Sequence, residues 1–207
     1  MDISNKCISR DLTNEEYNWI ISTSSYISID TETTGLNPIK DNLCLIQIYA
    51  NEKFFLIKYR KDIEYTNLKK LFASSNVVKV FHHAIFDIRF LMNNLNIIRV
   101  DNVVCTKIAF KILNGENKKS SLKELLNKYL NIKLSKEQQL SDWSKEFLEE
   151  EQMEYAKNDV RYLIKLWRVL KNKLIEDDLY EYASKCFEFI TVQAYLNNRG
   201  IDNIFEY

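Results

Sequence analysis

The order in which extended and helical patterns follow one another most limits what this chain can fold into. Short, apolar, β-branched segments dominate its first half, and patterns with apolar residues three and four apart fill its last part. Three early strands, then strands alternating with helices, then helices alone favour a mixed sheet flanked by helices, an α/β domain. The expected strands are 26–30, 43–49 and 54–59, which form a meander, and 77–81; the expected helices are 12–22, 65–73, 85–94, the later part of 103–113, 121–129, 148–174 and 178–196.

Composition is that of an ordinary globular domain. The 207 residues, 46% hydrophobic and 28% charged, can build one sizeable core and are few for two. Three glycines and one proline leave little material for a flexible linker. We therefore expect residues 1–207 to form a single domain.

No segment has the composition of a targeting or membrane sequence. The first ten residues are polar, and no stretch approaches the ~20 apolar residues of a membrane span. Cys7, Cys44, Cys105 and Cys186 show no C-x-x-C spacing of the kind that zinc sites and redox motifs use. Cys44 lies in an apolar run and Cys186 on an apolar helix face, so both are expected to be buried. These features predict a cytoplasmic protein without membrane contact.

Charge is balanced overall but uneven along the chain. There are 29 basic and 29 acidic residues, without the basic surplus usual in proteins that hold long nucleic acids non-specifically. Residues 105–136 carry eight Lys and two Glu, and residues 137–159 carry eight acidic side chains and two Lys, as solvated helix surfaces often do. A nucleic-acid substrate is therefore expected to be short or to be held locally by metal ions.

Carboxylates stand at three points where the expected elements end or begin. Asp30 and Glu32 end the first strand, and side chains two apart on a strand point to the same face. Two carboxylates there repel each other unless a cation lies between them, and oxygen ligands of this kind suit Mg²⁺ or Mn²⁺. Asp87 lies in the first turn of a later helix, where the helix dipole alone would also favour an acid.

Tyr155 and Asp159 are four residues apart on a late helix and therefore share one face. This spacing is weak by itself, because an exposed helix face would show it as often. The order of the pieces is more specific: a D-x-E on a strand, an aspartate opening a later helix, and a Y-x-x-x-D on a late helix.

With these three segments in this order, the chain resembles the DEDDy 3′-5′ exonucleases of the ribonuclease D-like group. Residues 29–36 (IDTETTGL) resemble the first exonuclease motif, residues 82–87 (HHAIFD) the second and residues 155–160 (YAKNDV) the third. Tyr155 stands where a sister class has histidine. The resemblance implies a ribonuclease H-like fold and an enzyme that hydrolyses phosphodiester bonds from the 3′ end.

A closer resemblance is to the nano-RNase C group of small bacterial exonucleases. It rests on residues 41–47, 105–109, 134–143, 186–187 and 200–201 and covers nearly the whole chain. It implies a ring of eight subunits that degrades short RNA, including dinucleotides, to 5′-mononucleotides. Ribonuclease D itself is longer, and we expect this chain to lack its extra helical domains.

The resemblance also implies a role for each motif residue. Two divalent ions, Mg²⁺ or Mn²⁺, are the implied cofactors. Asp30, Glu32 and Asp159 would ligate the first ion, with Asp30 bridging to the second and Asp87 supporting it. Tyr155 would orient the attacking water, because an unshifted phenol with a pKa near ~10 is a poor base at neutral pH.

Substrate contacts are less sharply indicated. Leu36 would wedge against the 3′-terminal base, or is an ordinary apolar turn residue. Trp143 would stack on a base or fill the core, and His82 and His83 would contact phosphate or pack beside the second motif. The remaining substrate-binding candidates are Thr33, Phe86, Lys136 and Gln139.

The final helix and the tail, about residues 177–207, carry more apolar surface than one domain needs. One stripe at helical spacing contains Leu179, Tyr182, Ala183, Cys186, Phe187, Ile190 and Ala194. Outside that stripe lie Phe189, Val192, Tyr195 and Leu196, and the tail adds Ile201, Ile204, Phe205 and Tyr207. Large apolar patches usually mark interfaces, so we expect a homo-oligomer unless the tail folds back over them.

Three other functions fit some of these features. The same chemistry could trim longer RNA 3′ ends, as ribonuclease D does, or could cut DNA. A nucleic-acid-binding module without activity would not need all five motif residues. A hydrolase using Cys105 with His82 or His83 would lack any known sequence signature around its nucleophile.

Overall fold

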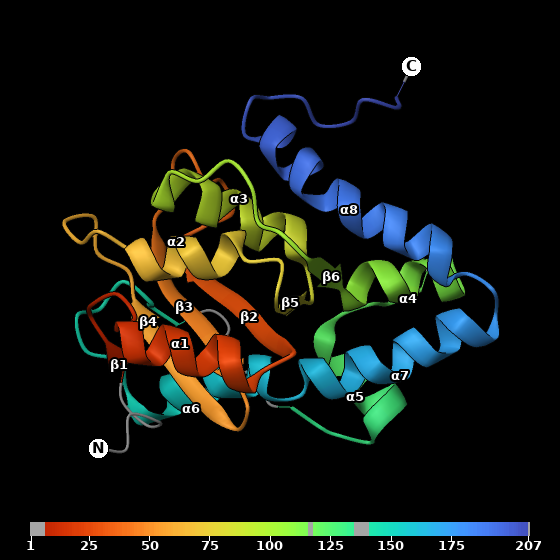
Figure 1. Cartoon of the computed structure of the whole chain (residues 1–207), viewed down its shortest axis with the longest axis horizontal. Helices are drawn as coiled ribbons and strands as arrows, with labels where there is room; N and C mark the ends of the chain where they lie inside the picture. Colours follow the sequence, from red (N-terminus) through yellow and green to blue (C-terminus); the bar gives the residue numbers. More distant parts are fainter. Residues whose placement is uncertain (1–6, 116–117, 135–140, 207) are drawn as a thin grey trace.

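The computed structural model describes residues 7–115, 118–134 and 141–206, and six strands in this part of the chain form one mixed sheet (Figure 1). The strands are β1 (Cys7–Ile8), β2 (Tyr26–Thr33), β3 (Leu43–Ala50), β4 (Lys53–Lys58), β5 (Val78–Phe81) and β6 (Val103–Cys105). Their order in the sheet is β1-β4-β3-β2-β5-β6. The α/β class and the mixed sheet are confirmed.

Strand pairing explains how the site-bearing strand becomes central. β2, β3 and β4 form the expected antiparallel meander, with Asp30 opposite Gln47 and Glu32 opposite Leu45. β5 pairs parallel to the other side of β2, and β6 follows it. The two-residue β1 adds parallel to β4; sequence analysis missed it, because two residues carry no recognisable alternation.

Eight helices surround the sheet in the described residues. They are α1 (Asn14–Thr23), α2 (Thr66–Ala73), α3 (Ala84–Leu95), α4 (Thr106–Asn114), α5 (Leu122–Leu130), α6 (Glu150–Arg161), α7 (Leu163–Glu176) and α8 (Tyr180–Asn197). Thr13 and Ser121 cap α1 and α5 through capping boxes with Glu16 and Glu124, as their sequences indicate. Among the described residues, no helix has both the length and the apolar composition that crossing a membrane requires.

The single helix expected over 148–174 is wrong, because the chain leaves helical geometry at Tyr162. Tyr162 has φ −107° and ψ −4° and separates α6 from α7. α6 packs on β2, β3 and β4, whereas α7 packs on β2, β5, α4 and α5. The two halves pack against different elements, which explains the helix break at Tyr162 although no Gly or Pro lies near it.

Two apolar cores pack against the sheet. The larger one contains Ile27 and Ile29 of β2 together with residues of α1, α2 and α3. The smaller one lies under α6, where Leu45 meets Trp143 and Ala156. Figure 1 shows α4, α5, α7 and α8 gathered at the β6 end of the sheet.

The terminal helix buries only part of its expected stripe. Ala183, Phe187, Ile190 and Ala194 are buried, but Cys186 and Tyr182 are exposed, Tyr182 by 69%. Burial of Cys186 was thus a wrong expectation, since α8 turns that position outward, whereas burial of Cys44 is confirmed.

The tail does fold back toward α8. The rings of Phe189 and Phe205 lie 5.6 Å apart, and Gln193 and Asn197 donate hydrogen bonds to the carbonyl of Asp202. Three apolar tail residues nonetheless stay exposed: Ile201, Ile204 and Phe205. Folding back therefore leaves part of the apolar surface in contact with water.

Candidate active site

Three carboxylates from two elements meet on the α6 side of the sheet. Asp30 and Glu32 project from the same face of β2 because they are two residues apart on one strand. α6 brings Asp159 over them, and one oxygen of each carboxylate lies within 4.8 Å of the other two. The structure thus brings together three of the residues selected from the sequence.

The electrostatics of this cluster favour a bound cation. Burial, followed by the charges of Asp87, Asp159 and Glu32, raises the pKa of Asp30 well above its ordinary value. Burial and the neighbouring charges likewise raise the pKa of Glu32, and burial raises that of Asp159 to about 7. Carboxylates in this position ionise together only when positive charge offsets their repulsion. An all-oxygen ligand set fits Mg²⁺ or Mn²⁺.

Asp87 stands beside this group rather than within it. It lies in the first turn of α3, is 2% exposed, and accepts a 2.7 Å hydrogen bond from the Thr31 hydroxyl. Burial raises the pKa of Asp87 to about 7, although the Thr31 hydrogen bond opposes the shift. Sequence reasoning missed Thr31; its position between Asp30 and Glu32 on a buried strand is the signal that could have identified it.

Tyr155 lies one helical turn before Asp159 on α6 and faces the carboxylates. Its hydrogen-bonding interaction with Asp159 lowers the pKa of that carboxyl against the effect of burial. Burial, followed by the charges of Asp159, Glu32 and Asp30, raises the pKa of Tyr155 far above the ordinary phenol value. The phenol therefore stays protonated at every physiological pH and can act as a hydrogen-bond donor.

The Trp143 ring packs against the Tyr155 ring. The two rings are 6.0 Å apart at 44°, and Trp143 is only 3% exposed. This burial favours the core-filling interpretation over base stacking, because neither face of the indole is open to a ligand. Trp143 thus acts on the site through the ring it packs against.

A buried lysine holds the loop that carries Trp143. The Lys58 amine donates hydrogen bonds to the carbonyls of Trp143, at 2.7 Å, and Lys145. Gln152, buried in the first turn of α6, donates to the Ser141 hydroxyl at 2.9 Å and to a neighbouring carbonyl. β4 and α6 therefore clamp this loop between them.

Lys58→Met is expected to loosen this clamp. Two carbonyls would lose their donor, which costs about 1–3 kcal/mol of unfolding free energy, and the ring beneath Tyr155 would lose its fixed position. We expect kcat to fall about tenfold with little change in KM, since misplacement acts mainly on the transition state. Lys61→Met, at an exposed neighbouring position, is the matched control. Equal kcat in both variants would show that the clamp serves stability alone.

A tight loop after β2 presents Leu36 to solvent. Thr33 donates a 2.6 Å hydrogen bond to the Gly35 carbonyl, and Asp41 accepts one from the Asn37 amide at 2.8 Å. A Cβ on Gly35 would lie 2.4 Å from the Asp41 carboxylate, so a larger residue there would force the Asp41 side chain to shift. Leu36 is 80% exposed, a position from which it can reach a ligand.

The residues around the second motif differ in accessibility. Both ring nitrogens of His82 are engaged within 2.9 Å, by the Thr106 hydroxyl and the Ser120 carbonyl. Burial lowers the pKa of His82 to about 3, so packing describes it better than phosphate contact. His83 is exposed and stacks on the half-buried Phe86 at 6.1 Å. Lys136 and Gln139 lie outside the described residues.

The geometry does not support a cysteine hydrolase. The Cys105 thiol donates to the carbonyl of His82 at 3.1 Å, not to an imidazole nitrogen. Burial raises the pKa of Cys105, which keeps the thiol protonated and a poor nucleophile.

Comparison with known proteins agrees with this geometry. Residues 5–175 match a family model described as 3′-5′ exonuclease. The exosome complex exonuclease RRP6 of Saccharomyces cerevisiae is 32% identical over 174 residues, which are 79% of this chain and 23% of that protein. Ribonuclease D of Zymomonas mobilis is 30% identical over 74% of this chain and 40% of that protein. The chain thus spans less than half the length of these two relatives.

Solved structures match over a larger share. Brucella melitensis NrnC bound to pGG has a TM-score of 0.86 and 33% identity, over 98% of this chain and 100% of that chain. The same nuclease with bound Mg²⁺ has a TM-score of 0.87 and 32% identity, over 96% of each chain.

Proposed function

The chain belongs to the 3′-5′ exonuclease family, and we propose that it degrades short RNA oligonucleotides to 5′-mononucleotides. The observation that carries the proposal is the meeting of Asp30, Glu32 and Asp159 with oxygens within 4.8 Å. Such a cluster suits phosphodiester hydrolysis once it holds divalent cations. The cations would attract the anionic scissile phosphate, which the bare carboxylates would repel.

DEDD exonucleases use divalent metals, and the donor set here fits them. Asp30, Glu32 and Asp159 would hold one Mg²⁺ or Mn²⁺, and Asp87 would help Asp30 to hold a second. Bound divalent cations lower the pKa of a bound water and offset charge on the phosphate oxygens. NrnC with bound Mg²⁺ supports this assignment.

Tyr155 supplies a positioned hydroxyl rather than a base. Its raised pKa keeps the proton on the phenol oxygen, so that it can donate to an oxygen of the phosphate or of the attacking water. Trp143 and the Lys58 clamp hold the ring in place during this contact. Leu36, at the exposed loop tip, would pack against the 3′-terminal base.

Short substrates are favoured by two observations. The formal net charge is zero, which gives little non-specific attraction for a long polyanion. NrnC, which this chain matches over nearly its full length, has been solved with the short ligand pGG bound. Trimming of longer RNA is the second candidate, favoured by the identity to ribonuclease D and RRP6.

A competition assay separates these candidates. With a dinucleotide and a longer RNA present together, we expect a higher kcat/KM for the dinucleotide, measured by the release of labelled mononucleotide. Equal kcat/KM values would remove the short-substrate proposal and favour trimming, while leaving the exonuclease chemistry standing.

We further propose that the protein is a homo-oligomer, with eight subunits as in the group it resembles. Tyr182 and Val192 of α8 are 69% and 48% exposed, and Ile201, Ile204 and Phe205 of the tail are also exposed. Contacts between copies would cover this apolar surface. Light scattering at micromolar concentration should give a mass several times 24.7 kDa, and a particle of 24.7 kDa would contradict the proposal.

A further inference from the structure

A second cavity lies at the other end of β2 from the carboxylates. Its volume is about 380 Å³, within the range of small-molecule sites. The walls come from the end of α1, the start of β2, the β3–β4 turn, the end of α6 and the first turns of α7. Tyr26 in its wall precedes Asp30 by four strand residues, roughly 13 Å, so the two sites are separate.

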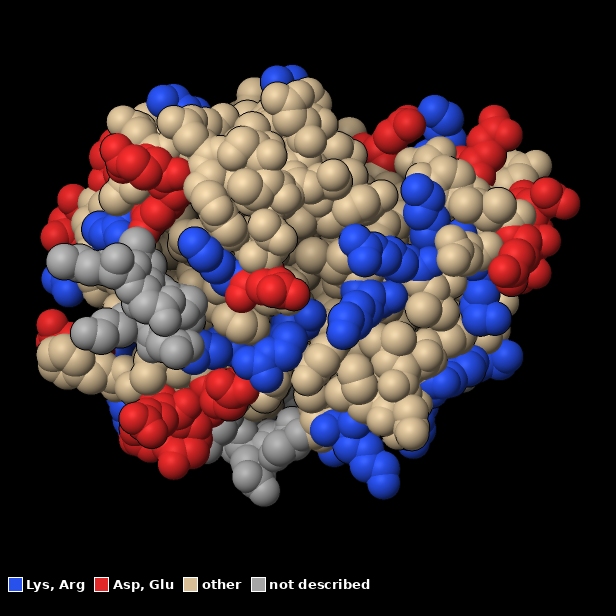
Figure 2. Space-filling model, turned by 60° about the horizontal axis from the view of Figure 1, so that its bottom comes forward, with Lys and Arg blue, Asp and Glu red and all other residues tan. Residues whose placement is uncertain are grey.

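The lining is basic in a protein without net charge. Arg161, Lys165 and Arg168 contribute three positive charges, against the single carboxylate of Glu52. Figure 2, which brings the bottom of Figure 1 forward, shows Lys and Arg gathered in a band across the middle and right of that face. Local charge of this sign favours an anionic ligand.

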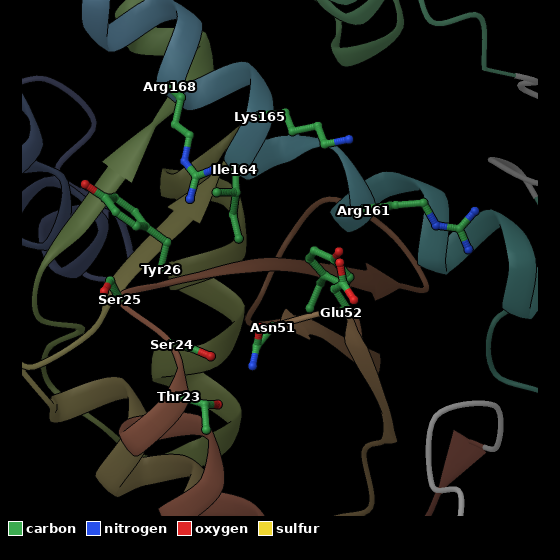
Figure 3. Close-up of a pocket in the computed structure, with 11 residues that line it drawn as sticks. Thr23, Ser24, Ser25, Tyr26, Asn51, Glu52, Arg161, Ile164, Lys165 and Arg168 are labelled. Atoms are coloured by element: carbon green, nitrogen blue, oxygen red, sulfur yellow. The ribbon is translucent and has the colours of Figure 1, made fainter.

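Arg168 is the cation best placed to bind. Figure 3 shows its side chain reaching from α7 toward the pocket, while those of Arg161 and Lys165 extend outward. Arg161 is already engaged, with Glu154 at 3.0 Å and over the Phe54 ring at 5.0 Å. No ion pair or hydrogen bond engages the Arg168 guanidinium among the residues that the structure describes, so its donors are free for a ligand.

Ser24 gives an independent sign of a missing acceptor. Its hydroxyl is buried, has no hydrogen-bond partner in the described structure, and points into the pocket in Figure 3. A buried hydroxyl without a hydrogen-bond partner destabilises the fold, and a hydrogen bond to a ligand oxygen would offset that cost. Arg168 and Ser24 thus line the same pocket from different elements.

We propose that this pocket binds the phosphate group of a nucleotide. The Arg168 guanidinium would donate two parallel hydrogen bonds to phosphate oxygens, and Lys165 would add charge at the rim. Glu52, which faces the pocket from the β3–β4 turn in Figure 3, would accept from ribose hydroxyls. The choice of a nucleotide among phosphate compounds rests on the proposed function, whose product is a 5′-mononucleotide.

Calorimetric titration with adenosine 5′-monophosphate tests this site. EDTA is included so that no cation at the carboxylates holds the phosphate. We expect binding to the wild-type protein, at least about tenfold weaker binding of adenosine, and at least about tenfold weaker nucleotide binding by Arg168→Ala. Lys173→Ala, at an exposed position of α7 outside the pocket, should bind like the wild type. Undetectable binding by the wild type, or unchanged affinity in Arg168→Ala, would overturn the proposal.

A second titration identifies the source of the phosphate. A seven-nucleotide RNA is titrated into the Asp159→Ala protein and into the Asp159→Ala, Arg168→Ala double variant. A loss of about tenfold in the double variant means that a phosphate of bound RNA enters the pocket, and equal affinity restricts it to free nucleotides. Both results keep the site, provided that Arg168→Ala weakens nucleotide binding. Neither titration involves catalysis, so an inactive wild-type enzyme would contradict the proposed function and leave this inference intact.

Discussion

Asp159→Asn is expected to abolish RNA hydrolysis while leaving the fold intact. The substitution removes one of the three carboxylates whose oxygens converge within 4.8 Å and so weakens the cation site. Loss of several kcal/mol of transition-state stabilisation lowers the rate by at least about a thousandfold. Release of mononucleotides from labelled RNA measures this, with Glu151→Gln, an exposed acid on the same helix, as control. Wild-type activity in Asp159→Asn would contradict the metal mechanism.

The same variant should be more stable than the wild type without metal. The pKa of Asp159 is raised to about 7 in the fold, so its protonated form contributes stability below the unfolded pKa near ~4, and this is lost as pH rises through 7. Asn stays neutral, so in EDTA the variant should melt at a higher temperature than the wild type at pH 8. The difference should shrink toward pH 4. A lower melting temperature for the variant at pH 8 would show that repulsion between the metal-free carboxylates does not destabilise the fold.

Tyr155→Phe is expected to slow the chemical step strongly while leaving substrate binding almost unchanged. Removing the hydroxyl should lower kcat by about 10²–10³, which matches loss of one preorganised donor, with little change in KM. The ring itself should keep its place, because Trp143 packs against it. Steady-state kinetics on a dinucleotide measure the split between kcat and KM, and Tyr162→Phe, at the junction of α6 and α7, is the control. An unchanged kcat would leave Tyr155 with a packing role only.

Much of the fold could be predicted because its signals are local. The capping boxes at Thr13 and Ser121, and the apolar runs of β2, β3 and β4, depend on neighbouring residues alone. The break at Tyr162 and the strand β1 depend instead on tertiary partners, which leave no trace in a short window. Cys186 was misplaced for a related reason: its helix face is apolar in sequence, but α8 docks through Ala183 and Phe187.

The site shows the same division. Asp30, Glu32 and Asp159 were recognisable from spacing and motif order, and the structure brings them together. The supporting contacts join residues far apart in the chain, such as Thr31 with Asp87 and Lys58 with the Trp143 carbonyl. The pocket around Arg168 likewise needs the fold, because its walls come from five separate elements.

Digestion of a 5′-labelled RNA of about ten nucleotides tests whether the protein is a metal-dependent 3′-5′ exonuclease. With Mn²⁺ or Mg²⁺ the wild-type protein should shorten the label stepwise from the 3′ end, and EDTA or Asp159→Ala should stop it. The released products should be 5′-mononucleotides. Immediate release of a labelled 5′-mononucleotide, internal cleavage, or undiminished digestion in EDTA would contradict a metal-dependent 3′-5′ exonuclease.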